Sequence, residues 1–297
     1  MKRRILVAAV ALLVALSASC AKARINQFQS FSQAGTAYAK AVAALLDQAG
    51  ATAIDTDTLL LVKDRDAFSV PERGQQILAR NKLMKERLAI LGALKRHAQL
   101  LQSYFEALGA LAGSNAPSGI GGAAEGVVKS LGALHPSIQN ATIGKLAVSS
   151  FVGSIVQIAV AHFQAAALEQ ELKKNAQAIE RELDLQEAAL KAVAETLRTD
   201  LQVQLNQQEA EGVVLPFAGA NSLPSSWPQT RKETLQASLS LGSAAAAADA
   251  ARKLKLSFIA LAEGRAQVVD VPAMVSDIND ILTLIEKVKG VPPPAKP

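Results

Sequence analysis

The chain has 297 residues, of which 50% are apolar, 19% are charged and 4% are aromatic. This composition excludes a disordered chain, which carries more charge and fewer apolar residues, and it is not typical of a β-sandwich. The single cysteine excludes an internal disulfide framework and a zinc site built from cysteines, and three histidines leave little room for a histidine-rich metal centre.

The first residues have the layout of an export signal. Three basic residues at 2–4 precede a twelve-residue uncharged run at 5–16, and small residues follow at 17–19. The apolar run is too short to span a bilayer permanently. We therefore expect residues 1–19 to be a signal peptide that is removed on export, so that the mature chain leaves the cytoplasm.

The only cysteine, Cys20, lies where cleavage would occur. The stretch Leu16-Ser17-Ala18-Ser19-Cys20 resembles the lipobox of bacterial lipoproteins, although Ser17 stands where a branched aliphatic residue is usual. This resemblance covers twenty residues and implies that Cys20 carries lipid and holds the protein on a membrane of the cell envelope, in the periplasm or at the outer membrane. Several acyl chains give stable anchoring. The alternative is ordinary secretion, with cleavage after Ala23.

Removal of the signal changes the charge balance. Residues 1–19 contain three basic and no acidic residues, so basic residues fall from 31 to 28 against 26 acidic ones, and the formal net charge falls from +5 to +2. The remaining basic clusters are short and are not interleaved with aromatic residues that could stack on bases. We expect no nucleic-acid partner.

Apolar residues at helical spacing predict helices along nearly the whole mature chain. The first is expected at 28–49, where Gly35 fills a gap in the apolar stripe and Gly50 ends the helix. A shorter helix is expected at 52–66. Ser69-Val70-Pro71-Glu72 has the pattern of a capping box, which predicts a very long helix from residue 70 to Ala112, stopped by Gly113.

A second very long helix is predicted at about 140–211, with a linker at 212–226 that contains two prolines. A further helix is expected from Trp227 to Glu263, and a last one from about Asp270 to Gly290. A Pro-rich tail follows at 291–297. Because such stripes cannot be stable as isolated helices, the helices must pack together. The prediction is an all-α, elongated antiparallel bundle of about six helices, two of them very long, formed by residues 20–290.

The segment 107–168 is unusually apolar and rich in glycine. It contains three charged residues, and 146–168 contains none. One interpretation is a helix buried within the bundle beside a Gly-rich turn. The order long helix, apolar Gly-rich segment, long helix also resembles the architecture of helical pore-forming toxins, which implies insertion into a membrane. A third interpretation is an exposed apolar surface that binds a partner.

Motifs for catalysis and metal binding are incomplete. The stretch from Gly121 to Ser130 has a lysine two places too late for a P-loop, and no strand precedes it. No Glu-x-x-His pair or His-Glu-x-x-His motif occurs. His97 follows two basic residues and is expected to be solvated. We therefore predict no catalytic residue, no metal ligand and no cofactor, and Cys20 as the one site residue.

These observations favour an exported, lipid-anchored helical bundle that is not an enzyme and that binds or supports another component of the cell envelope. Its expected partners are the membrane, through lipid on Cys20, and an envelope protein. The first alternative is a membrane-active protein that inserts through 107–168. The second is a ligand carrier or an enzyme with a site inside the bundle.

Overall fold

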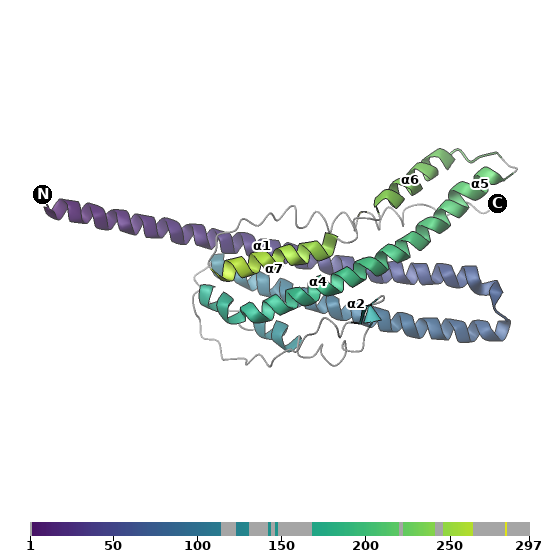
Figure 1. Ribbon diagram of the computed structural model, residues 1–297, viewed down its shortest axis with the longest axis horizontal. Coiled ribbons are helices and arrows are strands. Elements are labelled where there is room, and N and C mark those ends of the chain that lie inside the picture. The colour runs from purple at the N-terminus through teal and green to yellow at the C-terminus, as the bar shows by residue number, and fades with distance from the viewer. Residues whose placement is uncertain are drawn as a thin grey trace.

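The computed structural model describes residues 2–113, 123–130, 142–143, 146–147, 168–219, 222–240, 246–263 and 283. Almost all of these residues are helical, which confirms the predicted all-α, elongated bundle (Figure 1). The longest helices are α1 (Lys2–Asp64), α2 (Val70–Gly113) and α4 (Leu168–Glu209). Two-residue strands β1 (Thr142–Ile143) and β2 (Leu146–Ala147) pair antiparallel.

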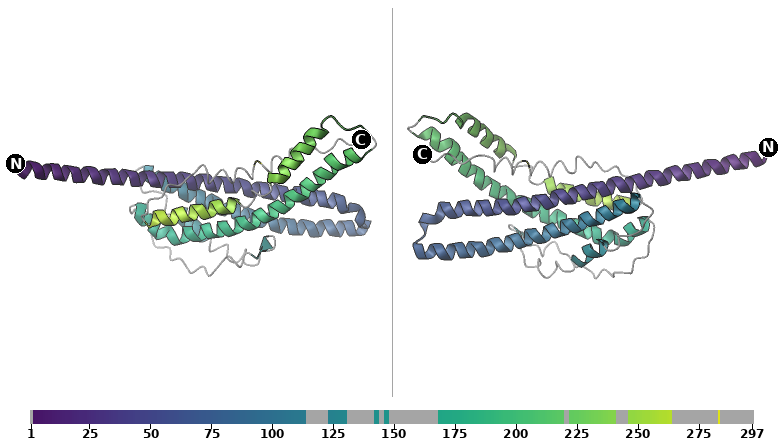
Figure 2. Two further views of the ribbon diagram at one scale, coloured as in Figure 1. Left: turned by 45° about the horizontal axis from the view of Figure 1, so that its top comes forward. Right: turned by 180° about the vertical axis from the view of Figure 1, so that it is seen from behind.

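Helix α1 is continuous through Gly50, so the prediction of two separate helices at 28–49 and 52–66 is wrong. Gly50 has a packing role in place of a stop. A Cβ atom there would lie 3.2 Å from Leu88 Cδ2, so the glycine lets α2 approach α1 closely. The first turns of α1 project beyond the rest of the molecule, and the N-terminus lies at one end (Figures 1 and 2).

A short connection joins α1 to α2 in an antiparallel hairpin. It consists of the 3₁₀ turn η1 (Arg65–Ala67) and two further residues. The Ser69 backbone N–H donates to Glu72 Oε2 at 2.8 Å, as a capping box requires. The Ser69 hydroxyl donates to the same carboxylate at 2.6 Å and does not cap the helix itself, so that part of the prediction is wrong. Helix α2 then ends at Gly113, as expected.

The expected start of α4 near residue 140 is wrong, because β1 and β2 lie at 142–143 and 146–147. The described part of α4 begins at Leu168. The β-branched pair Thr142-Ile143 favours extended backbone. The end of α4 falls close to the predicted position.

The linker predicted at 212–226 also begins later. Helix α4 continues into the π-helical turn η3 (Ala210–Val214) and into α5 (Leu215–Ala218). Pro216 lies in the first turn of α5, where its missing N–H is not needed. The chain leaves the helix at Gly219, and α6 (Trp227–Ser240) starts as predicted.

Helix α7 (Ala246–Ala262) occupies the second half of the predicted helix 227–263. Residues 241–245 lie outside the described residues, as do the predicted helix from Asp270, apart from helical Thr283, and the Pro-rich tail.

The core lies where α1, α2, α4 and α7 run side by side. The Phe31 ring lies 5.5 Å from the Phe105 ring and 5.9 Å from the Phe258 ring, so three helices meet at one aromatic cluster. The predicted stripes supply most of this core: Phe28, Phe31, Tyr38, Val42 and Leu45; Leu91, Leu94, Leu101, Phe105 and Leu108; Ile179, Leu183, Leu190, Val193, Leu197 and Leu201. Gly35 is required because a Cβ there would lie 2.5 Å from the Phe105 ring.

Most of the segment 107–168 lies outside the described residues, so its predicted membrane insertion is not tested. In the described parts, Leu108, Ala112, Ala124 and Val127 are buried in the core. Across the residues that the structure describes, no helix combines the length and the apolar character needed to cross a membrane.

Candidate functional site

The end of the α1–α2 hairpin differs from the rest of the bundle in having no buried side chain. This part, residues 57–90, is called the hairpin tip below, and each of its 34 residues is half-buried or exposed. The tip lies at the end of the molecule opposite the N-terminus, and α4 diverges from it (Figures 1 and 2). A pair of helices without further cover leaves its apolar stripe in contact with water.

A polar cluster marks the place where α4 leaves the hairpin. The Asp200 carboxylate forms an ion pair with Arg87 of α2, with an N–O distance of 2.5 Å. Thr56 of α1 donates to the Asp200 carbonyl and accepts a hydrogen bond of 2.8 Å from Gln204. Burial raises the pKa of Asp200, and the hydrogen bond and charge of Arg87 oppose this increase.

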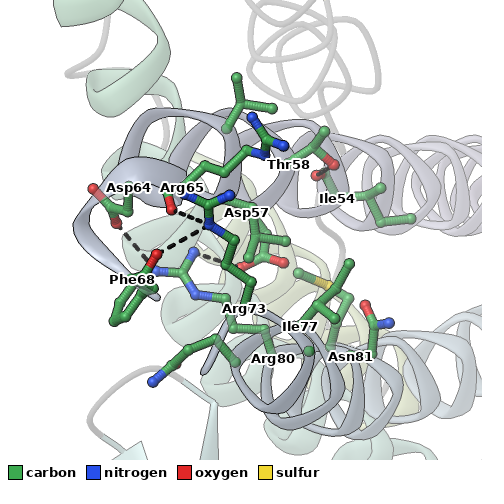
Figure 3. Close-up of a pocket in the computed structure, with 15 residues that line it drawn as sticks. Ile54, Asp57, Thr58, Asp64, Arg65, Phe68, Arg73, Ile77, Arg80 and Asn81 are labelled. Atoms are coloured by element: carbon green, nitrogen blue, oxygen red, sulfur yellow. Dashed lines mark hydrogen bonds and ion pairs between the residues drawn. The ribbon is translucent and has the colours of Figure 1, made fainter. Parts of the chain in front are cut away.

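A groove of about 560 Å³ runs along the hairpin tip between α1 and α2 (Figure 3). Its α2 side continues the buried stripe of that helix through Met84 and Ile77, whereas Ile54 and Val62 on its α1 side lie on a face that is exposed along the body too. Three of its apolar side chains are strongly exposed: Ile54 at 44%, Val62 at 71% and Ile77 at 45%. The other apolar lining residues are half-buried: Leu61, Phe68 and Met84. Contiguous apolar side chains in contact with water are a common feature of protein-binding surfaces.

Two arginines of α2, at the edge of the groove, form ion pairs and hydrogen bonds with α1 and with the turn of the hairpin. Arg80 lies 3.3 Å from Asp57 and 3.5 Å from Asp64, so it connects the two helices. Arg73 donates to the carbonyl oxygens of Arg65 and Phe68 and pairs with Asp66 at 3.2 Å. Figure 3 shows the contacts of Arg80 with the two aspartates and of Arg73 with the two carbonyl oxygens. They fix the spacing of the helices, whereas exposed ion pairs add only about 0–1 kcal/mol each to stability.

The two sides of the groove carry opposite charge. On α1, residues 54–64 contain three acidic residues and one basic residue, whereas residues 72–87 of α2 contain five basic residues and two acidic ones. Asp57 and Asp64 on this acidic side, and Asp66 in η1, form the ion pairs described above. Within the described residues, no group of acidic, histidine or cysteine side chains could hold a metal ion.

A second exposed apolar region lies at the end of the arm formed by α4, α5 and α6. Phe217 is 66% exposed and its ring stacks on Trp227 at 5.4 Å. The Trp227 indole N–H donates to the Val213 carbonyl at 3.0 Å, which ties α6 to η3. Val214 and Leu215 are also exposed.

A chain of buried polar groups lies inside the bundle. His97 of α2 is buried, so the expectation that it is solvated is wrong: its two basic neighbours do not share its face of the helix. His97 Nδ1 lies 2.7 Å from Oε2 of fully buried Glu182 on α4, and His97 Nε2 lies 2.9 Å from the Ser130 hydroxyl. Gln186 donates to the other Glu182 oxygen at 3.0 Å. Three chain segments therefore meet at His97.

Tyr38 of α1 lies in the same interior. Burial raises its pKa well above the ordinary value, and the negative charges of Glu182 and Glu187 raise it further. Its hydroxyl has no hydrogen-bond partner among the described residues. A neutral phenol therefore stands near a buried carboxylate in the centre of the bundle.

Cys20, the predicted lipidation site, lies on the part of α1 that precedes the core. Comparison with protein-family models, curated proteins and solved structures gives no match to this chain. The interpretation of function therefore rests on the residues and geometry described above.

Proposed function

We propose that the protein is an exported, lipid-anchored helical bundle that uses the hairpin tip to bind a protein of the cell envelope. The observation that carries this proposal is the groove at the tip, whose apolar lining stays in contact with water between α1 and α2. Exposed apolar lining with a charged edge has the composition of a protein interface.

The position of the groove supports a role at a distance from the membrane. Helix α1 connects Cys20 to Ile54, the first residue of the groove, over 34 residues. At 1.5 Å per residue, this helix holds the groove about 50 Å from a lipid on Cys20. A rigid rod with its anchor at one end and its binding surface at the other suits a component that reaches a partner away from the bilayer.

Two measurements in intact cells test this proposal. A clickable fatty acid should label the wild-type chain and not Cys20→Ala, and absence of label on the wild type would contradict the anchor. A photo-crosslinking amino acid at Gln76, which lines the groove, should give a protein adduct that disappears in Ile77→Glu. If the photo-crosslinking amino acid placed at exposed Leu256 of α7 gives an equal yield of protein adduct, the tip is not a specific binding surface.

A second candidate function follows from the buried polar chain. Ser130, His97 and Glu182 are connected through the same atoms as the nucleophile, base and acid of a serine hydrolase, with the hydroxyl at Nε2 and the carboxylate at Nδ1. In such a site the Ser130 hydroxyl attacks an ester carbonyl, His97 accepts its proton and returns it to the leaving alcohol, and water then releases the acid.

A fluorophosphonate probe separates the two candidates. A hydrolase predicts labelling of the wild type that is lost in Ser130→Ala and in His97→Gln. Absence of labelling in the folded wild-type protein would leave the polar chain with a structural role and would remove the enzyme candidate.

A further inference from the structure

We propose that the end of the arm enters the interface of a lipid bilayer. This part of the molecule, residues 212–219 and 222–230, is called the arm end below. It comprises the end of η3, the whole of α5 and the start of α6. The inference uses a different surface from the groove of the hairpin tip, and it depends neither on the proposed function nor on lipid at Cys20.

The arm end presents apolar side chains to water at a projecting part of the molecule. Leu215 is 64% exposed and Phe217 is 66% exposed, and Val214 and Leu223 are exposed as well. Figures 1 and 2 show α5 and the start of α6 at the far end of the arm, apart from the described parts of α1, α2 and α7. These side chains are therefore accessible to a surface that approaches the end of the molecule opposite the N-terminus.

The composition of the arm end favours a lipid surface over a protein partner. The nineteen residues 212–230 contain no charged residue, in a chain of which 19% is charged. Protein interfaces set their orientation and their choice of partner with charged and hydrogen-bonding groups around an apolar centre, and this stretch offers no charge for that purpose. A bilayer interface requires apolar side chains and favours aromatic ones.

Phe217 and Trp227 supply the aromatic side chains that a bilayer interface favours. Their rings stack with centroids 5.4 Å apart. The Trp227 indole N–H donates to the Val213 carbonyl at 3.0 Å, so the indole can leave water without an unpaired donor. Tryptophan is enriched where hydrocarbon meets water in membranes. The stacked pair is therefore suited to lie beneath the lipid headgroups.

The backbone of the arm end also loses little on leaving water. Three prolines lie between 216 and 228, and a proline has no N–H that needs a partner. The Gly219 N–H donates to the Leu215 carbonyl, and the Trp227 N–H donates to the Pro224 carbonyl, each at 3.0 Å. Because an unpaired N–H is costly in an apolar medium, these features favour contact with the outer part of a bilayer.

The experiment uses the fluorescence of Trp227, which reports on the arm end alone because it is the only tryptophan of the chain. The protein is residues 20–297 with Cys20→Ala, which lacks the signal and the acylation site and keeps every residue of the core cluster. Vesicles of phosphatidylcholine are the probe. We expect the protein to float with the vesicles and brominated acyl chains to quench the fluorescence of Trp227.

Two leucine variants locate the contact. Leu215→Asp should weaken vesicle binding by about tenfold or more, because a carboxylate resists leaving water. Leu256→Asp is the matched control, because Leu256 is 51% exposed on α7, outside the arm, and this variant should bind vesicles as the parent chain does. Equal loss of binding in the two variants would overturn the inference.

Three further outcomes would also overturn it. One is absence of vesicle binding by the folded protein at millimolar lipid. Another is vesicle binding without quenching of Trp227, which would place the contact elsewhere on the chain. The third is a photo-crosslinking amino acid at Leu223 that joins the chain to a protein and not to lipid in intact cells, which would make the arm end a protein-binding surface. None of these results changes the expected adduct at Gln76, so the proposed function is tested separately.

Discussion

The body of the bundle and the hairpin tip are built from the same two helices and have opposite environments. Between Phe28 and Ala53 of α1, and between Leu91 and Ala112 of α2, the apolar stripes are buried by α4 and α7. Between 57 and 90 the stripes continue, yet every residue is half-buried or exposed. The comparison teaches that periodicity sets which face of a helix is apolar, whereas the number of neighbouring helices decides whether that face is buried.

The largest expected change in the free energy of unfolding comes from the buried His97–Glu182 pair in the body. His97→Leu should destabilise the protein by about 3–5 kcal/mol, because it leaves the buried Glu182 carboxyl group without its partner. The double variant His97→Leu/Glu182→Leu should recover much of this loss, since both polar groups are then removed. Chemical denaturation of the wild type, His97→Leu, Glu182→Leu and the double variant measures the coupling energy between the two side chains. Destabilisation by the double variant equal to the sum of the two single variants would show that the pair is not energetically linked.

The next contrast compares one large apolar side chain from each region. Leu101 is fully buried, so Leu101→Ala should cost about 2–5 kcal/mol of unfolding free energy through lost burial and a cavity. Ile77→Ala at the tip should cost no more than about 0.5 kcal/mol in dilute solution, because Ile77 is 45% exposed. Urea midpoints at constant m-value give both numbers. Similar costs at the two positions would contradict the distinction between body and tip.

Substitution of alanine for two glycines should change the stability of the protein in opposite directions. Gly35→Ala should destabilise by about 1–3 kcal/mol, since the new methyl group would overlap the Phe105 ring. Gly74→Ala should stabilise by about 0.5–1 kcal/mol, because nothing lies within 4 Å of the new methyl group and alanine favours helix. Thermal unfolding of the two variants is the measurement. Destabilisation by Gly74→Ala would mean that the tip is already packed against something.

The smallest effect concerns the start of α2. The Ser69 hydroxyl and backbone N–H lower the pKa of Glu72. A lowered carboxyl pKa stabilises the fold above the ordinary carboxyl pKa, and this contribution is lost as the pH falls through the lowered pKa. We expect the first amides of α2 to exchange faster at low pH in the wild type and at neutral pH in Glu72→Gln. Exposed Glu86→Gln is the control and should leave these amides unchanged.

Much of the fold could be predicted from periodicity. The stripes of α2 and α4, the start of α2 at Ser69-Val70 and its end at Gly113 follow from apolar spacing and from local capping signals. Three boundaries differ from the prediction. Gly50 lies inside α1 where α2 packs closely against it, Pro216 follows a π-helical turn that continues α4, and Thr142-Ile143 is extended.

The candidate sites were less accessible to sequence reasoning. The apolar residues of the tip were visible as part of the stripes, but only the departure of α4 shows that they lie uncovered. His97 looked solvated because its sequence neighbours are basic, and Glu182, 85 residues away, had no signal that linked it to His97. A histidine in the continuation of the Leu94, Ala98 and Leu101 stripe was the one available indication of burial.

Hydrogen exchange of the full chain tests the central claim most directly, because it reads the tip and the body in one sample. At low concentration, amides of residues 57–90 should exchange at least tenfold faster than those of 91–112. Equal protection of the two regions at the lowest concentration would contradict the claim that the apolar stripe of the tip lies uncovered in the single chain.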